Sequence, residues 1–264
     1  MSNALDKFSY NLYLQENNLG PYGKILNSFS AKTTLCPDIF EKGEYDYVMR
    51  EDVLKKLLEI AQEFVDWLGL DVTVQDVTLT GSLANFNWSE FSDVDLHIII
   101  DFSKFKEDQD LVKNFFDAKK NVWNNEHNIK IKGFDTELYV QDSAEKHTST
   151  GVYSLKNNRW VVEPEYESKE IDKELVMRKA QMLTKKINEL INRFNEGQDV
   201  TSEVEALKKK IKNFRQAGLD RAGEYSYENL AFKLLRRTGY IEKLFILGNT
   251  LADRKLSLDE LMNW

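Results

Sequence analysis

The strongest chemical signal in the chain is a pair of aspartates, Asp93 and Asp95, separated by one residue. They begin the run DVDLHIIID, residues 93–101, in which alternating residues give way to continuous apolar ones, as in a buried strand. Residues i and i+2 of a strand point to the same face, so we expect the two carboxylates to lie side by side. Adjacent carboxylates repel, and a divalent cation that prefers oxygen ligands removes this repulsion. The pair therefore predicts a site for Mg²⁺ or Mn²⁺.

A glycine and a serine, Gly81 and Ser82, come just before this strand. The run DVTVQDVTLTG, residues 71–81, alternates β-branched with polar residues and is typical of a strand that ends in a turn. Glycine lets backbone N–H groups approach a phosphate, and the serine hydroxyl adds a donor. A phosphate-binding turn and a metal site on consecutive strands are what phosphoryl transfer requires.

Such chemistry usually needs a third carboxylate, which holds a second metal ion and activates the attacking hydroxyl. The run FDTELYVQD, residues 134–142, is predicted to be a further strand, and Glu137 lies in its middle. We take Glu137 as the third catalytic and metal-binding residue of a two-metal site. Asp135 is the competing candidate, because it alternates onto the same face of the strand.

Charge is distributed unevenly along the chain. Residues 1–167 carry 17 Lys and Arg against 29 Asp and Glu, whereas residues 168–264 carry 19 against 15. Additional phosphate contacts are therefore expected in the C-terminal part. There Lys233, Arg236 and Arg237 fall at i, i+3 and i+4 of a predicted helix, and Lys233 and Arg237 are candidates to bind a nucleotide phosphate. An ordinary solvent-exposed helix face is the equal alternative.

The other elements predict an α+β fold, a small mixed sheet with helices followed by a helical region. An apolar stripe at three- and four-residue spacing predicts a helix over residues 50–69, with Gly69 as its C-cap. A second helix is expected over 109–127, and a hairpin over 151–164 turns at Asn157-Asn158. Four further helices are predicted over about 170–195, 201–217, 226–238 and 239–252. The domain boundary is placed between residues 1–167, a catalytic domain with an N-terminal helical extension, and residues 168–264.

Three side chains near the carboxylates have two interpretations each. His97 shares the face of Asp93 and Asp95 and could contact a phosphate, but a structural histidine is favoured because the strand is apolar. Phe86 and Trp88 could stack on a base, but packing of this connection as a lid is favoured.

Composition restricts the class of protein. With 264 residues and 42% hydrophobic residues, the chain can bury a substantial core. The single cysteine, Cys36, allows no internal disulfide and fits a reducing compartment. The N-terminus has no signal-peptide pattern, and no apolar run is long enough to span a bilayer. We therefore expect a soluble cytoplasmic protein with no membrane partner.

The Gly-Ser turn, the later Ser-Asp-x-Asp and the strand acid together resemble the DNA polymerase β-like nucleotidyltransferase superfamily, over about residues 77–140. The local sequence is similar to that of uncharacterised nucleotidyltransferases of large bacteriophages at two segments, Thr80-Gly-Ser-Leu-Ala-Asn-Phe-Asn-Trp88 and Ser92-Asp-Val-Asp-Leu-His97. The resemblance implies a polymerase β-like core in which Gly81 and Ser82 bind phosphate. It also implies that Asp93, Asp95 and Glu137 bind the metal ions.

The activity implied by this resemblance is transfer of a nucleoside monophosphate from a nucleoside triphosphate, ATP foremost, to a hydroxyl group. The acceptor stays open between RNA ends, a protein, a small molecule and a second nucleotide. A phage-encoded enzyme would act in the host cytoplasm. Two alternatives are an alarmone-type pyrophosphokinase and an inactive, antitoxin-like nucleotide-binding module. The intact Gly81-Ser82 turn and aspartate pair argue against the inactive module.

Overall fold

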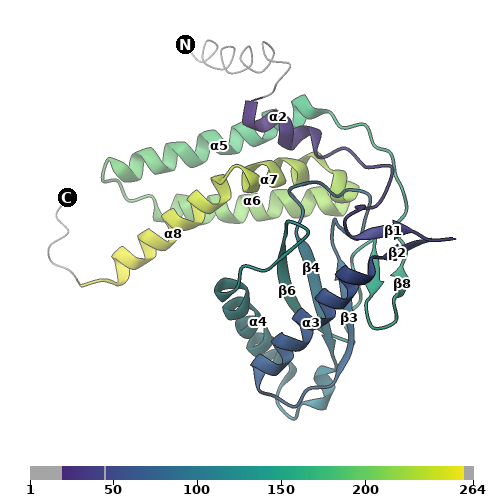
Figure 1. The fold of residues 1–264 in the computed structure, drawn as a ribbon. Coiled ribbons are helices and arrows are strands. Elements are labelled where there is room, and N and C mark those ends of the chain that lie inside the picture. Colours follow the sequence, from purple (N-terminus) through teal and green to yellow (C-terminus); the bar gives the residue numbers. More distant parts are fainter. Residues whose placement is uncertain (1–19, 45, 259–264) are drawn as a thin grey trace. The chain divides into compact units, whose positions relative to one another are not determined.

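The computed structural model describes residues 20–44 and 46–258, and the chain is a mixed α+β protein of two compact units. The sheet unit comprises residues 31–168, and the helical unit comprises residues 169–258 together with residues 20–30. Figure 1 labels the elements of both.

The sheet unit is built on six strands in the order β5-β6-β4-β3-β7-β8. Their bounds are β3 Val74–Thr80, β4 Val94–Ile100, β5 Lys130–Ile131, β6 Phe134–Asp142, β7 Val152–Ser154 and β8 Arg159–Val162. β4 and β6 run parallel, and all the other pairs are antiparallel, so the sheet is mixed as predicted. The expected turn of the hairpin is present, with Asn158 at φ 48°.

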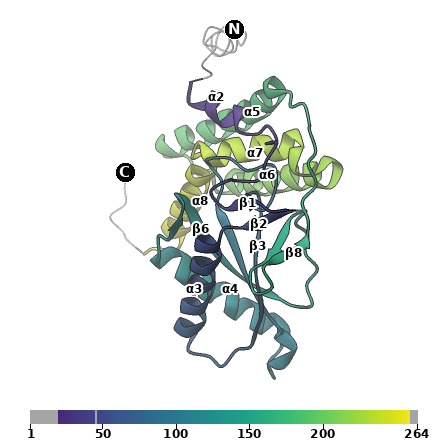
Figure 2. The ribbon, with the colours of Figure 1, turned by 45° about the vertical axis from the view of Figure 1, so that its right-hand side comes forward.

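One face of the sheet is apolar and packs against two helices, α3 (Glu51–Leu68) and α4 (Gln109–Glu126). Figure 2 shows both helices beside the strands. The predicted stripe of α3 is buried, and the helix ends at Gly69 with φ 64°. Phe64 of α3 meets Trp123 of α4 edge-on, with ring centroids 5.5 Å apart. The core of this unit thus lies between the two helices and the sheet.

The opposite face of the three central strands is polar. The register places Thr80, Asp95 and Glu137 in one row across β3, β4 and β6. The next row contains Thr78, His97 and Tyr139. Since side chains alternate along a strand, these six point away from the apolar core. We call them the polar face.

Short elements that the sequence pattern did not predict complete the sheet unit. β1 (Phe40–Lys42) and β2 (Tyr47–Met49) form a separate two-stranded sheet, and η1 is a turn of 3₁₀-helix at Phe102–Lys104. Phe40 packs on Tyr153 and Trp160, with ring centroids 5.3 and 5.1 Å away. These aromatic contacts attach the small sheet to the β7–β8 hairpin.

In its described residues, the helical unit contains the four predicted helices, the additional helix α2 and a turn of 3₁₀-helix, η2. Their bounds are α2 Gly20–Asn27, α5 Lys173–Asn195, α6 Thr201–Ala222, η2 Gly223–Tyr225, α7 Tyr227–Arg237 and α8 Tyr240–Leu256. α6 continues about a turn beyond its predicted end, because residues 218–222 keep the helix hydrogen-bonded up to Gly223. Among the described residues, no helix combines the length and apolar character that a membrane crossing needs.

The N-terminal residues are the point at which the domain assignment differs from the structure. We expected all of residues 1–167 to belong with the sheet, but α2 packs against α7 in the helical unit. Leu26 and Phe29 are buried there, and Ser28 accepts a hydrogen bond from Arg237 at 2.9 Å. Residues 1–19 lie outside the described part.

Candidate active site

The turn after β3 lies directly against Asp95. Gly81 has φ +74°, a conformation that L side chains rarely adopt. A Cβ atom added to it would lie 1.8 Å from Oδ2 of Asp95. The backbone therefore approaches this carboxylate so closely that no residue with a side chain fits without moving it.

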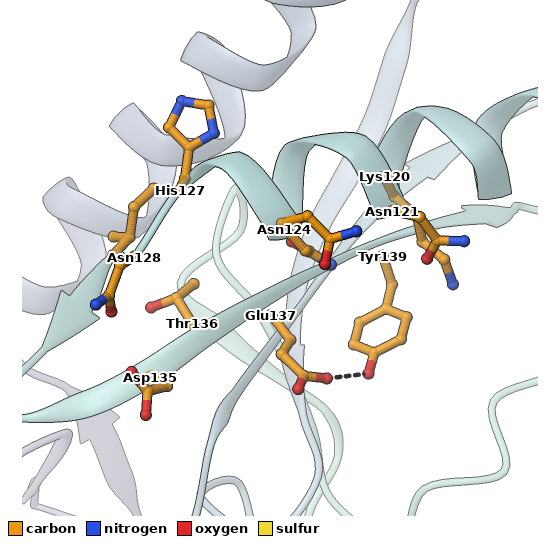
Figure 3. A pocket seen from close by; sticks show the side chains of 11 residues that line it. Lys120, Asn121, Asn124, His127, Asn128, Asp135, Thr136, Glu137 and Tyr139 are labelled. Atoms are coloured by element: carbon orange, nitrogen blue, oxygen red, sulfur yellow. Dashed lines mark hydrogen bonds between the residues drawn. The ribbon is translucent and has the colours of Figure 1, made fainter. Parts of the chain in front are cut away.

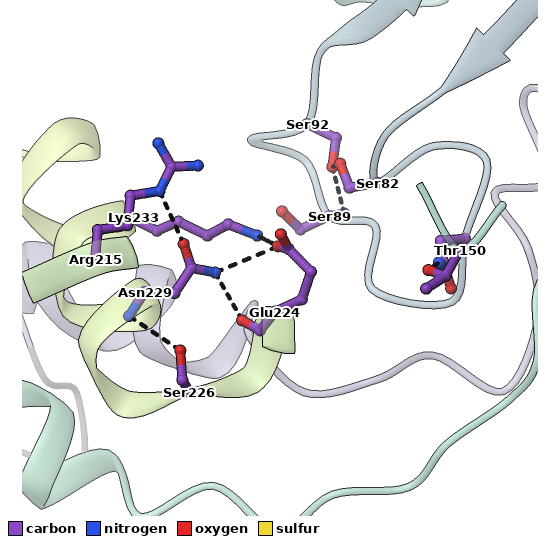
Figure 4. Close-up of polar contacts among 10 residues, drawn as sticks. Ser82, Ser89, Ser92, Thr150, Arg215, Glu224, Ser226, Asn229 and Lys233 are labelled. Atoms are coloured by element: carbon purple, nitrogen blue, oxygen red, sulfur yellow. Dashed lines mark hydrogen bonds and ion pairs between the residues drawn. The ribbon is translucent and has the colours of Figure 1, made fainter. Parts of the chain in front are cut away.

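Serine hydroxyls join the two ends of the connection between β3 and β4. The Ser82 hydroxyl donates to Oγ of Ser92 at 2.8 Å, and the same Oγ accepts from the backbone N–H of Ser89 at 2.9 Å (Figure 4). Ser92 is buried and directly precedes Asp93. This arrangement fixes the turn relative to the strand that bears the aspartates, and it occupies the hydrogen of the Ser82 hydroxyl.

The aromatic residues of this connection are packed. The indole N–H of Trp88 donates to the backbone oxygen of Thr34 at 2.8 Å. The ring of Phe86 meets the rings of Tyr47 and Tyr166 edge-on at 6.4 and 5.6 Å. Packing, the favoured interpretation of both residues, agrees with these contacts.

The parallel pairing of β4 and β6 brings the candidate carboxylates together. Asp95 is opposite Glu137 in the register. Asp93 directly precedes the first residue of β4. The Glu137 carboxylate accepts a hydrogen bond from the hydroxyl of Tyr139 at 2.5 Å (Figure 3).

The pKa of Tyr139 is raised by its surroundings, which include the three candidate carboxylates. Burial raises the pKa of its phenol far above the usual value, and the hydrogen bond to Glu137 raises it further. The negative charges of Asp95 and Asp93 act in the same direction. Tyr139 therefore stays protonated and serves as a donor, and all three carboxylates act on this one hydroxyl.

Neighbouring residues hold the ring of Tyr139. His97 stacks on it, with ring centroids 4.9 Å apart and planes at 23°, and the Lys120 ammonium lies 4.6 Å from its centroid. His97 Nδ1 also lies 2.9 Å from Oε1 of Gln141. Burial lowers the pKa of His97, so its imidazole is neutral at neutral pH. These contacts agree with the favoured structural interpretation of His97.

Asp135, the competing third carboxylate, has a different environment. The β5–β6 hairpin turns through Lys132 and Gly133, both with positive φ, 51° and 91°. This turn places Lys130 opposite Asp135, and the two side chains form an ion pair. Asp135 already has a cationic partner, and 66% of its side chain is exposed.

The two candidate phosphate ligands of the C-terminal part lie in the helical unit and have different neighbours there. The ammonium of Lys233 is 2.6 Å from Oε2 of Glu224, within a cluster that includes Asn229 (Figure 4). Arg237 donates to Ser28, and its guanidinium lies over the ring of Phe29. Their role in phosphate binding stays a prediction.

Sequence reasoning missed the support along the free edge of β6. The Asn124 amide of α4 donates to the backbone oxygen of Leu138 and accepts from its N–H, both at 3.0 Å. Asn124 therefore takes the place of a neighbouring strand next to Glu137. The residue type alone carries no signal for this, because an asparagine inside a helix usually faces solvent.

The chemistry of these carboxylates suits a hard divalent cation, but the side chains are not gathered around one point. No group of three His, Cys, Asp or Glu side chains in the described part of the chain is already close enough to hold a metal ion. The Glu137 carboxylate is instead bonded to Tyr139. Carboxylate oxygens on one sheet face are nevertheless the ligands that Mg²⁺ and Mn²⁺ prefer.

Comparisons with protein-family models, with curated proteins and with solved structures each found no match to this chain. The resemblance to polymerase β-like nucleotidyltransferases therefore depends on the residues of the motif and on their geometry.

Proposed function

We propose that this protein is a magnesium-dependent nucleotidyltransferase that transfers a nucleoside monophosphate from a triphosphate, ATP foremost, to a hydroxyl acceptor. The observation that carries the proposal is the parallel register of β4 and β6, which sets Asp95 beside Glu137. Asp93 adds a third carboxylate directly before β4. The backbone of Gly81 meets Asp95 at a distance that excludes any Cβ.

In this proposal Asp93 and Asp95 would hold both metal ions, and Glu137 would complete the site as the third carboxylate. Bound Mg²⁺ supplies neutralising charge for the phosphates and for the developing alkoxide. The protein itself contributes by positioning the carboxylates and the phosphates. Tyr139 keeps the Glu137 carboxylate on the polar face through its hydrogen bond. The Gly81 turn offers backbone N–H groups to a phosphate next to Asp95.

The reaction would be an in-line displacement at the α-phosphorus. The acceptor oxygen bonds to this phosphorus while the bond to the bridging oxygen of the β-phosphate breaks. Pyrophosphate leaves with the electron pair, and the hydroxyl proton passes to water. Glu137 is favoured over Asp135 for the third role because Asp135 is ion-paired with Lys130.

The position of the label tests this proposal. ATP labelled at the α-phosphate should transfer label to an acceptor pool in Mg²⁺, whereas ATP labelled at the γ-phosphate should release it as pyrophosphate. Asp93→Asn or Asp95→Asn should lower transfer by about a thousandfold, since metal ions contribute several kcal/mol to such a transition state. Calorimetry of ATP binding should show that Mg²⁺ strengthens binding in the native protein and not in Asp95→Asn.

Asp71→Asn is the matched control, because Asp71 is an exposed aspartate of the same unit, outside the site. Full activity of either site variant, or activity that survives excess chelator, contradicts the proposal. Transfer of the γ-label to the acceptor would indicate pyrophosphoryl transfer instead. Binding of ATP that does not depend on Mg²⁺, without turnover, would indicate an inactive module.

A further inference from the structure

A cavity of about 540 Å³ lies beside β6, between its edge and the end of α4. We call it the edge pocket. Its walls include Asn121, Asn128, Lys120, Glu137 and Tyr139, which Figure 3 labels, and also Asn125. All of its lining belongs to the sheet unit, within residues 120–139.

The edge pocket is continuous with the carboxylates through Glu137. This side chain lines the pocket, and it is also the register partner of Asp95. Its hydrogen-bond donor, Tyr139, lines the same pocket. A molecule in the pocket therefore lies next to the third carboxylate of the proposed site.

Amides dominate the chemistry of the walls. The side chains of Asn121, Asn125 and Asn128 are exposed, and they make no hydrogen bond to any other residue that the structure describes. An amide offers both donors and an acceptor, which suits hydroxyl groups, since these also donate and accept.

The charged groups of the walls are already engaged. The ammonium of Lys120 is 3.1 Å from Asp117 and lies over the Tyr139 ring. Asp135 is paired with Lys130. The remaining carboxylate of the walls, Glu137, contacts the neutral phenol of Tyr139. The walls therefore offer no unpaired positive charge to attract an anionic ligand.

Size and chemistry together favour a small molecule over a nucleic-acid strand. The volume falls in the range of small-molecule sites, about 300–1,000 Å³. A strand would need a basic groove and exposed aromatic rings for stacking. Here the lysine is ion-paired, and the imidazole of His127 is stacked on Trp123 with ring centroids 3.8 Å apart.

We propose that the edge pocket binds the acceptor, and that the acceptor is a small neutral polyhydroxylated compound, such as a sugar or glycoside. The role of this compound as the acceptor rests on the proposed function. The binding itself depends only on the amide-lined pocket and can be measured without metal or nucleotide.

The direct test is binding of a defined probe panel: myo-inositol, methyl glucoside, ribose and sucrose. Saturation-transfer NMR on the full chain, without metal or nucleotide, should detect contact with at least one of them. Asn125→Leu and Asn128→Leu should each weaken that binding about fivefold to tenfold, the ratio that one lost neutral hydrogen bond corresponds to. Asn195→Leu, an exposed asparagine of the helical unit, should leave it unchanged.

The second measurement uses transfer of the α-label to the bound probe and to a mixed-sequence RNA oligonucleotide. The proposal expects label on the probe, with a raised KM for the probe in Asn125→Leu and an unchanged KM for ATP. Binding of no panel member, binding insensitive to both asparagine variants, or label on the RNA instead overturns it. Probe binding by a native protein that shows no Mg²⁺-dependent ATP binding would support the pocket and reject the nucleotidyltransferase function, so the two failures are distinguishable.

Discussion

Two glutamates, one in each unit, have opposite surroundings: Glu228 in the helical unit and Glu137 in the sheet unit. In the helical unit, Glu228 is nearly buried, with 10% of its side chain exposed, and pairs with Lys179 at 3.0 Å and Arg221 at 2.6 Å. In the sheet unit, Glu137 accepts its hydrogen bond from the neutral phenol of Tyr139. It does so in a row that also contains Asp95.

This difference indicates a structural role for Glu228, whereas the surroundings of Glu137 are compatible with the proposed metal ion. Burial raises the pKa of Glu228, but the hydrogen bonds from Lys179 and Arg221 outweigh that effect and lower it overall. The charge of Glu228 is thus satisfied within the fold. On the polar face, Tyr139 supplies a hydrogen bond but no positive charge, and the three carboxylates jointly act on it. Under the proposed function, we expect a divalent cation to stabilise this group of carboxylates.

Among the variants outside the aspartate pair, the largest effect should come from Gly81→Ala. The new Cβ would collide with Asp95 Oδ2 and displace the carboxylate by more than about 1 Å, and such a misplacement can cost a hundredfold or more in rate. Gly69→Ala is the control, because Gly69 has a similar φ of +64° with open space around it. Both variants should lose stability on thermal melting because of the positive φ, and Gly81→Ala should lose more because of the collision, but only Gly81→Ala should lose nucleotidyl transfer. Equal activity of the two would show that the turn does not position Asp95 for catalysis.

The next largest effect on activity should distinguish Glu137 from Asp135, two acidic residues of β6. Glu137→Gln should reduce kcat by about a hundredfold with little change in ATP affinity, because its metal contact matters mainly in the transition state. Asp135→Asn should be mild, since it loses only an exposed ion pair with Lys130. Steady-state kinetics with varied ATP gives both quantities. The reverse ranking would transfer the third carboxylate's role to Asp135.

The choice between Asp135 and Glu137 could not be made from the sequence alone. A period of two puts Asp135 and Glu137 on one face but cannot say which of them meets Asp95. The answer depends on the parallel register of β4 and β6, a pairing between residues about forty positions apart. It also depends on the two-residue turn at Lys132-Gly133, which brings Lys130 to Asp135.

Long periodic segments were predicted well because their apolar residues repeat over several turns or strand steps. The helix over residues 50–69 is α3, and the run 134–142 is β6. By contrast, β1 and β5 contain three and two residues, too few for any periodicity. The edge pocket could not be predicted either, since it depends on where α4 ends beside β6.

The comparison predicts a third, smaller effect, this time on stability. Glu228→Gln should destabilise the protein by about 1–2 kcal/mol, because two cations lose a largely buried partner. The lowered pKa of Glu228 means that its contribution is present above its unfolded pKa, about 4.3, and is lost as the pH falls further. Denaturant unfolding at pH 7 and pH 4 measures both. Glu189 is an exposed glutamate of α5, so Glu189→Gln should change neither the free energy of unfolding at pH 7 nor its dependence on pH.

The smallest effect concerns His97, which supports Tyr139 rather than a substrate. Its pKa is lowered chiefly by burial, with Lys120 and His147 adding to the shift, while the hydrogen bond to Gln141 and the charge of Glu145 oppose it. A histidine whose folded pKa is lowered binds its proton more readily when unfolded. Stability should therefore be full above pH of about 6.5 and should decline as the pH falls below it.

His97→Asn should remove this part of the pH dependence. Thermal melting of the native protein and of the variant between pH 7.5 and pH 5.5 measures it: the gap between the two melting temperatures should narrow as the medium becomes more acidic. His127→Asn is the control, because His127 is the exposed histidine that stacks on Trp123. A gap that widens in acid would mean that protonated His97 is stabilised in the fold, and its ring would then carry charge next to Glu137 instead of acting as a neutral support.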